Sequence, residues 1–227
     1  MSGYSQFCPV ALASEVFAER WTPLILRELL LGRHRFNELQ QGVGGISQSL
    51  LVQRLRTLEA AGVIERAPNP AGRGSEYHLT AAGAELESVI NPLAAWSQRW
   101  LELREDCLNA AALVKAIQMG IRGDQLPRGR TLVRFDFTDP DQRSYWILLE
   151  RPTAEVCFHD PGGPIDLVVS ADVDALTRVY LGRMPLGSAM RSRRIALDGA
   201  RPLVRGFPRW LGLNPYARHA QGRWKAA

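Results

Sequence analysis

Residues 47–61 place hydrogen-bonding side chains on one side of an expected helix and leucines on the other. At about 100° per residue, Ser49, Gln53 and Arg56 share one face, with Ser47 and Gln48 at its N-terminal tip. Glutamine and arginine can form paired hydrogen bonds with adenine and guanine edges in the major groove of DNA. The pattern favours a DNA recognition helix. A hydrated helix face with no partner remains the alternative.

The ends of this helix are marked by the sequence itself. Ser47 can cap the free N–H groups of the first turn, and Gly62 can adopt the left-handed conformation just past the last turn. Leu51, Leu55 and Leu58 recur at the spacing of one helix face. They are predicted to attach the helix to a core, which leaves the polar face outward.

The elements on either side of the helix complete a known motif. Helices are expected over 9–18, 22–31 (capped by Thr22) and 36–41, and a Gly-rich turn at 42–45 leads into the polar helix. Two short helices joined by such a turn form a helix-turn-helix. Residues 63–67 and 76–79 alternate as two strands around a Pro/Gly turn and form a wing behind it.

Arginines near the motif are candidates for contacts with DNA phosphates. Residues 20–56 carry six arginines against Glu28 and Glu38. A local positive field of this kind attracts phosphates. The residues predicted to hold phosphates are Arg35, Arg54 and Arg73, the last at the tip of the wing.

A long helix, capped by Thr80, is expected from residue 81 to about 103. Its apolar side chains fall at heptad-like positions: Leu86, Val89, Leu93, Trp96 and Trp100. A winged-helix domain by itself has little to pack against such a stripe, so we expect this helix and the helix at 9–18 to pair two protomers. Pro92 is expected to bend or interrupt the helix.

In the second half of the chain, apolar residues recur mostly at the two-residue spacing of strands instead of the spacing of helices. A helix is expected over 104–121, followed by strands over 132–137, 144–149, 154–158 and 165–169 as an antiparallel meander. A helix over 172–181, a segment at 184–190, a strand at 195–197 and a helix over 201–211 complete an α/β layer. The fold class is α+β, with domains at 1–103 and 128–227 and a helical linker at 104–127.

Composition excludes several classes of protein. With 46% hydrophobic and 22% charged residues the chain is typical of soluble globular proteins, and no apolar run is long enough for a membrane span. No signal peptide is visible, so a cytoplasmic location is expected. No catalytic or phosphate-binding motif is present, and the cysteines and histidines lack metal-site spacing. We expect no enzyme activity, no cofactor and no metal.

The 28 Lys and Arg and 23 Asp and Glu residues give a net charge of +5, unevenly distributed. Residues 1–104 hold ten of each sign, which leaves 18 and 13 in residues 105–227. From 178 to 227 there are 11 basic residues and a single acid, Asp198. This run could meet nucleic acid or an anionic head group, but the composition favours a solvated face and a basic tail that frays after about Tyr216.

The first half resembles the HxlR-type bacterial transcription regulators over roughly residues 7–102. The resemblance rests on Cys8-Pro9-Val10, Arg20-Trp21-Thr22, residues 24–29, 35–39, 46–48, 62–66 and 77–83. It implies a dimeric winged-helix protein that binds a palindromic DNA operator. Some relatives of this type use an N-terminal cysteine as a redox or electrophile sensor, which makes Cys8 a candidate; a packing role is the alternative. The short wing turn departs from the family pattern.

The second half resembles the sterol-carrier-protein fold over about residues 128–213, on the strings at 166–172, 176–183 and 195–199. The resemblance implies a sheet covered by helices on one side, with an apolar tunnel between them for a lipophilic effector. The candidate lining residues are Trp146, Leu148, Val156, Phe158, Val169, Leu176, Tyr180, Met190, Phe207 and Trp210. Plain core packing is the alternative for each.

The sequence therefore predicts a homodimeric transcription regulator that binds double-stranded DNA and is modulated by an apolar small molecule. Two alternatives remain open at this point. One is a lipid or ligand carrier that uses its winged helix as a dimer scaffold. The other is a repressor whose sensor is Cys8.

Overall fold

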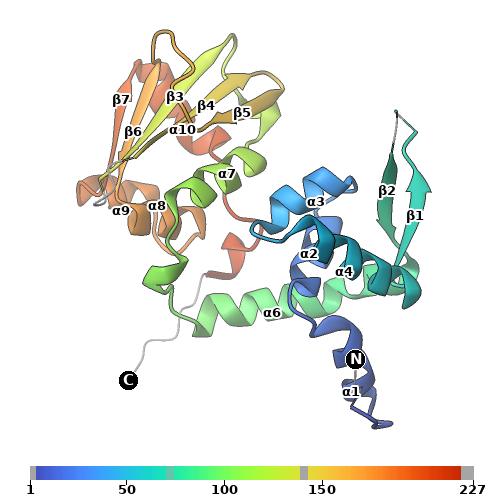
Figure 1. Ribbon diagram of the computed structural model, residues 1–227. Coiled ribbons are helices and arrows are strands. Elements are labelled where there is room, and N and C mark those ends of the chain that lie inside the picture. Colours follow the sequence, from blue (N-terminus) through green and yellow to red (C-terminus); the bar gives the residue numbers. More distant parts are fainter. Residues whose placement is uncertain (1–3, 71, 73, 139–142, 221–227) are drawn as a thin grey trace. The chain divides into compact units, whose positions relative to one another are not determined.

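The structure is a computed structural model that describes residues 4–70, 72, 74–138 and 143–220. The chain divides into two compact units, Met1–Leu93 and Ala94–Ala227 (Figure 1). The division falls inside one helix. Within the described part of the chain, no helix has the length and apolar character that crossing a membrane requires.

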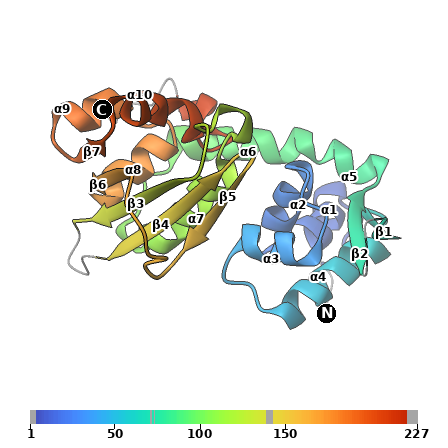
Figure 2. The same cartoon turned by 90° about the horizontal axis from the view of Figure 1, so that it is seen from above.

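The N-terminal unit is a winged helix-turn-helix, as the sequence predicts. Its elements are α1 (Pro9–Phe17), α2 (Thr22–Leu30), α3 (Phe36–Val43), α4 (Gln48–Ala60), β1 (Ile64–Pro68), β2 (Ser75–Leu79), α5 (Ala81–Glu85) and the start of α6 (Glu87–Trp100). Strands β1 and β2 pair antiparallel, with Ile64 opposite Leu79 (Figure 2). The core is built from apolar residues of α2, α3, α4 and β1: Ile25, Leu26, Leu29, Leu39, Leu51, Leu55, Leu58 and Ile64.

Two boundaries in this unit differ from the prediction. Thr22 does not cap α2; Trp21 holds the N-cap position with a φ of +81°, and Thr22 is buried. The helix expected over 81–103 is broken at Leu86, between α5 and α6, and not at Pro92. Pro92 lies inside α6, where it removes one backbone hydrogen bond without ending the helix.

The C-terminal unit is built on a five-stranded sheet in the order β5-β4-β3-β6-β7 (Figure 1). Its elements after α6 are α7 (Ala110–Gly120), β3 (Thr131–Phe137), β4 (Ser144–Glu150), β5 (Thr153–Cys157), β6 (Leu167–Ala171), α8 (Val173–Tyr180), α9 (Leu186–Arg191), β7 (Ile195–Gly199) and α10 (Arg201–Trp210). The predicted antiparallel meander is wrong for β6, which pairs parallel with β3 and places Leu167 opposite Val133. The connection over 158–166 carries the chain from β5 past β4 and β3 to the far side of β3.

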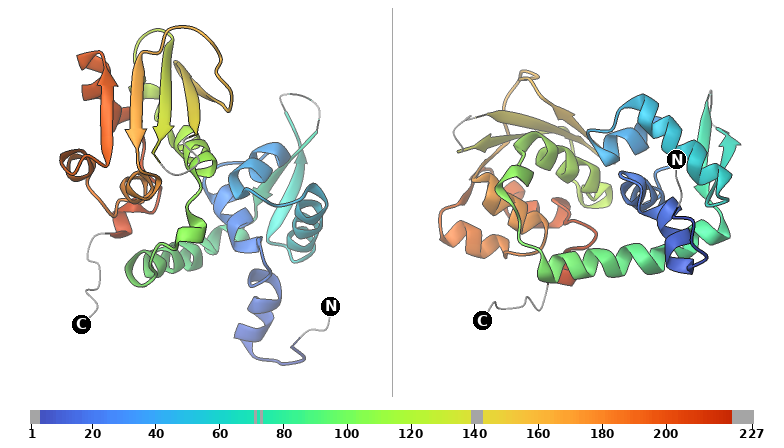
Figure 3. Two further views of the ribbon diagram at one scale, coloured as in Figure 1. Left: turned by 60° about the vertical axis from the view of Figure 1, so that its left-hand side comes forward. Right: turned by 60° about the horizontal axis from the view of Figure 1, so that its bottom comes forward.

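The helices of this unit gather on one side of the sheet (Figure 3, right-hand view). Residues 104–127 are not the linker that was predicted, because Leu113, Val114 and Ile117 of α7 belong to the hydrophobic core beneath the sheet. The helix begins at Ala110 and not at 104, after a 3-10 turn at Glu105–Cys107. Asn109 caps α7: its Oδ1 accepts a hydrogen bond from the Ala112 N–H at 2.9 Å.

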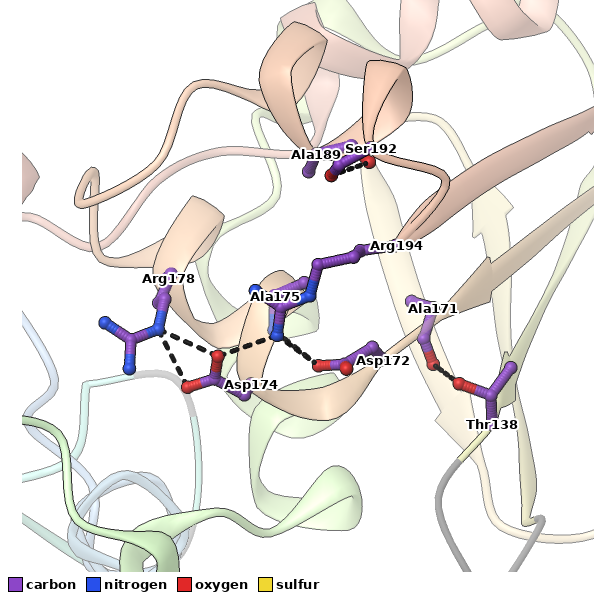
Figure 4. A network of polar contacts seen from close by, with 9 residues as sticks. All are labelled: Thr138, Ala171, Asp172, Asp174, Ala175, Arg178, Ala189, Ser192 and Arg194. Carbon is purple, nitrogen blue, oxygen red and sulfur yellow. Dashed lines mark hydrogen bonds and ion pairs between the residues drawn. The ribbon is translucent and has the colours of Figure 1, made fainter.

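A network of ion pairs joins the start of α8 to the strand that follows α9 (Figure 4). Asp172 caps α8 and also accepts from Arg194 at 2.9 Å, while Asp174 accepts from Arg178 and Arg194 at 2.8 Å each. Hydrogen bonds from Arg178 and Arg194 lower the pKa of the Asp174 carboxyl. The same contacts raise the pKa of Arg194. This network fastens α8 to β7 at the edge of the unit.

Candidate nucleic-acid interface

The polar face of α4 is exposed along the whole helix. Ser47 caps it by accepting a hydrogen bond from the Leu50 N–H at 3.3 Å, and the leucine face is buried as predicted. The five candidate base-reading residues, Ser47, Gln48, Ser49, Gln53 and Arg56, are all exposed. A shallow groove runs along this face and is lined by Ser49, Val52, Gln53, Arg56, Thr57 and Ala60. The face therefore offers exposed hydrogen-bond donors and acceptors of the kind that pair with base edges.

A buried carboxylate in α2 holds the end of the helix that precedes the turn into α4. Glu28 is 1% exposed and accepts hydrogen bonds from Arg27, at 2.6 Å, and from Arg33. Arg27 also donates to the Gly42 carbonyl at 3.0 Å. Gly42 lies so close that a Cβ there would overlap the Glu28 carboxylate. These contacts join α2 to the end of α3, directly before the turn that leads into α4.

In the sequence, Glu28 stands out only as one of two acidic residues among the arginines of residues 20–56. A signal for its role was present in the composition of α2. An acidic residue among leucines and isoleucine in a helix of nine residues is costly to bury unless it is paired. The arginine before it and the one five residues later are the partners that such a pattern would indicate.

The three arginines predicted to contact phosphates differ in their exposure and in their partners. Arg54 is 11% exposed; its guanidinium pairs with Glu19 at 2.6 Å and donates to the Arg20 carbonyl at 3.2 Å. It therefore fastens α4 to the α1–α2 connection instead of facing outward. Arg35 is 52% exposed and its Nε lies 3.4 Å from a Glu76 oxygen. Arg73 lies outside the described residues.

A further arginine that sequence reasoning missed stands between the recognition helix and the wing. Arg66 of β1 is exposed and lines a second groove together with Val52, Leu55, Arg56, Glu59 and Tyr77. Strand alternation would not have found it, because Arg66 is two residues from the buried Ile64 and a regular strand would place both on one face. It extends the positive surface from Arg56 onto β1.

The base of the wing is fastened to the loop before α3. The rings of His34 and His78 stack with centroids 4.5 Å apart. The Tyr77 N–H donates to the His34 carbonyl at 2.9 Å, and the Tyr77 carbonyl lies 3.1 Å from His34 Nδ1. The position of β2 relative to the helix-turn-helix is thereby set.

The apolar stripe of α6 is exposed within the single chain. Val89, Leu93, Trp96 and Trp100 are 44–51% exposed, whereas Leu86 is partly buried. Phe7 and Val10, at the start of α1, are exposed more fully. Cys8 lies between them at the N-cap of α1 and is exposed.

The ten candidate lining residues of the C-terminal unit do not line one space. Val169, Leu176, Tyr180, Phe207 and Trp210 are buried in the core between sheet and helices, and Val156 packs at its margin. Trp146 and Leu148 alternate with Tyr145, Ile147 and Leu149, which face that core, so they lie on the other face of the sheet. Phe158 and Met190 are substantially exposed. The predicted lining is therefore wrong for Trp146 and Leu148, because successive residues of a strand point to opposite faces of the sheet.

Among the described residues, no three metal-binding side chains come together. Cys107 is exposed, while Cys157 is partly buried and its burial raises the pKa of the thiol.

Comparisons with known proteins agree with this geometry for the first part of the chain. The family described as HxlR-like helix-turn-helix matches residues 16–105. The HTH-type transcriptional regulator YvaP of Bacillus subtilis is 32% identical over 100 residues, which are 43% of this chain and 93% of that protein. For sll1512 of Synechocystis the identity is 36% over 101 residues, 44% of this chain and 74% of that protein.

One solved structure that is similar is the reduced form of the transcriptional regulator YodB from B. subtilis. It is 31% identical, covers 43% of this chain and 97% of that chain, and has a TM-score of 0.38. Each of the three proteins is matched by less than half of this chain.

The Glu28 contacts predict a measurable loss of stability. In a Glu28→Gln variant, a neutral amide with a single acceptor oxygen replaces a carboxylate that serves two guanidinium groups. We expect the free energy of unfolding to fall by about 1–3 kcal/mol, measured by urea denaturation. Glu65→Gln, on the exposed side of β1, is the matched control and should stay within about 0.5 kcal/mol of the parent. Equal losses in the two variants would contradict the role of Glu28.

Proposed function

Because this chain belongs to the HxlR-like helix-turn-helix family of transcriptional regulators, we propose that it acts as a homodimer on a palindromic DNA operator. The observation that carries the proposal is the exposed polar face of α4 on a buried leucine face. A two-fold dimer would present two such helices to successive major grooves, about 34 Å apart.

Base reading is assigned to the exposed side chains of α4. Gln48 and Gln53 are suited to adenine and Arg56 to guanine, while Ser47 and Ser49 can donate or accept. Arg35 is the exposed candidate for phosphate contact from the helix-turn-helix, and Arg66 adds a cation on the wing side. Arg54 is left out of the interface because its guanidinium is held by Glu19.

These roles predict different effects of two substitutions. Arg56→Ala should cost about 1–3 kcal/mol of operator affinity and relax specificity at one base pair, because it removes a base contact. Arg35→Ala should weaken binding to all sequences alike, because phosphates carry no sequence information. The operator is first selected from random duplexes with the wild-type protein, and both variants are then measured on operator and random DNA. If Arg56→Ala weakens binding to operator and random DNA by the same factor, Arg56 does not read a base.

We assign dimerisation to the exposed apolar stripe of α6. The apolar residues at the start of α1 are proposed to contribute to the same contact between protomers. An amphipathic helix with half-exposed valine, leucine and tryptophans at heptad-like spacing is suited to pairing with a second copy. The stripe belongs to a helix that both compact units share. Pairing through α6 would therefore involve both units.

The dimer is tested by introducing charge into the stripe. Leu93→Glu with Trp96→Glu should shift the protein from twice 25.3 kDa to 25.3 kDa in sedimentation equilibrium at micromolar concentration, because each protomer would bury two carboxylates at the contact. Leu213→Glu, at a residue exposed to a similar degree in the C-terminal unit, is the control and should remain dimeric. A wild-type protein that sediments as a monomer, or a double variant that stays dimeric, would refute this assignment.

The finer part of the proposal is that an apolar small molecule bound in the C-terminal unit modulates DNA binding. Its support is a sheet covered by helices on one side, which the sterol-carrier resemblance implies. The core-facing residues Val169, Leu176 and Phe207 are the apolar lining that such a ligand would meet. Trp146 and Leu148, on the other face, are not part of this lining.

A fluorescent fatty-acyl probe tests the effector. The proposal predicts saturable binding to the wild-type protein and a change in operator affinity when the probe is bound. Absence of saturable binding would remove the effector and leave the DNA-binding role in place. DNA binding without operator preference, together with saturable probe binding, would instead favour a ligand carrier. The redox role of Cys8 stays a prediction.

A further inference from the structure

The last long helix of the C-terminal unit, α10, is divided between an apolar and a basic face. Leu203, Val204, Phe207 and Trp210 pack into or against the core. Arg201, Arg205 and Arg209 recur every fourth residue on the opposite side, and all three are exposed. Successive arginines are thus about 6 Å apart along the helix axis. We call these three residues the α10 arginine face; Figure 2 shows α10 along one edge of its unit.

Several other arginines of the same unit already have carboxylate partners. Arg178 and Arg194 are held by Asp172 and Asp174, and Arg134 pairs with Asp136. Within the described part of the chain, no carboxylate forms an ion pair with a residue of the α10 arginine face. Asp198 is the single acid from residue 178 onward. Their positive charge is therefore available to an external anion.

The distribution of charge along the chain indicates which anion. The first 104 residues, which contain the winged helix, have equal numbers of acidic and basic side chains, and the whole excess of +5 lies after them. Sequence-independent attraction to DNA comes from Lys and Arg that neutralise phosphates. The local positive charge of residues 20–56 is offset by acidic residues elsewhere in the first 104, so cations of the second half would add to the attraction.

We propose that the α10 arginine face binds the phosphate backbone of duplex DNA. The inference rests on the proposed function, because the winged helix is what brings a duplex to this chain. Guanidinium groups bind phosphates through paired hydrogen bonds, and a row of them at helical spacing can follow a strand. Tethering to a DNA-bound winged helix raises the local concentration of duplex at this face.

A membrane surface is a poorer match for this helix. Amphipathic helices bind membranes by inserting their apolar face beneath the head groups. The apolar face of α10 is instead occupied by its own core, where Phe207 and Trp210 are buried with their rings in edge contact, 4.9 Å between centroids. The α10 arginine face can therefore attract an anionic partner only through its charge. Duplex DNA is the densest linear array of phosphates that a DNA-binding protein meets.

The test replaces Arg201, Arg205 and Arg209 together by glutamine, a residue that keeps helix propensity and removes charge. The matched control replaces Arg128, Arg130 and Arg143, exposed arginines outside α10, by glutamine and changes net charge equally. Binding of the full-length protein to a mixed-sequence duplex of about three helical turns, long enough for more than one groove contact, is measured across a salt series. Thermal unfolding confirms that both variants fold.

We expect the α10 variant to reduce the slope of log K against log salt by about 3 for each protomer that contacts the duplex, and the control to leave the slope near that of the wild type. Affinity for operator and random DNA should fall by the same factor, so operator preference is retained. This separates the α10 arginine face from α4, whose variants change preference.

Three results would overturn the proposal. One is an α10 variant with a wild-type slope; another is a control variant with an equal loss, which would show an effect of net charge alone. The third is binding of the wild-type protein to phosphatidylserine vesicles that depends on the three arginines while duplex binding does not. If the wild-type protein shows no operator preference, the proposed function fails, but the slope on mixed-sequence DNA still decides the role of α10.

Discussion

The buried carboxylate of Glu28 is the interaction on which the presentation of the recognition helix depends. A charge removed from water destabilises the fold unless it is paired and hydrogen-bonded. Arg27 and Arg33 pair with Glu28, and Arg27 reaches on to the Gly42 carbonyl. The end of α3 is therefore held against α2. The turn that follows has glycines at φ +65° and +72°, and it aims α4 with its leucines inward. The outward polar face follows from this arrangement.

Selectivity and attraction are carried by different parts of the chain in the proposed function. The face of α4 offers amides, hydroxyls and one guanidinium, which discriminate between bases. Residues 1–104, which contain this face, have no net charge. Attraction to phosphates depends on the number of cations and not on their exact placement, so it can be contributed by a unit with a different fold. A helix shared by both units, α6, is the element through which dimerisation and a C-terminal effector would be coupled.

Local patterns predicted most elements of both units. Ser47 caps α4 and Thr80 caps α5, as predicted, because a cap is a contact over three residues and needs no distant partner. The parallel pairing of β6 with β3 was missed, because strand alternation is identical in parallel and antiparallel sheets. The exposed face of α4 was found from residue spacing. The partners of Arg54 were not, because Glu19 lies 35 residues away in the sequence.

The sequence alone determined the helix-turn-helix, the wing and the excess of positive charge in the second half. Each of these follows from periodicity, capping and composition, which act within a few residues or over the whole chain. Tertiary structure decided which polar groups are free to bind a ligand. The guanidinium of Arg54 forms an ion pair with Glu19, whereas the arginines of α10 have no acidic partner among the described residues. Trp146 and Val169 were likewise assigned to one cavity and lie on opposite faces of a sheet. Availability depends on long-range neighbours, and the order of residues along the chain does not specify them.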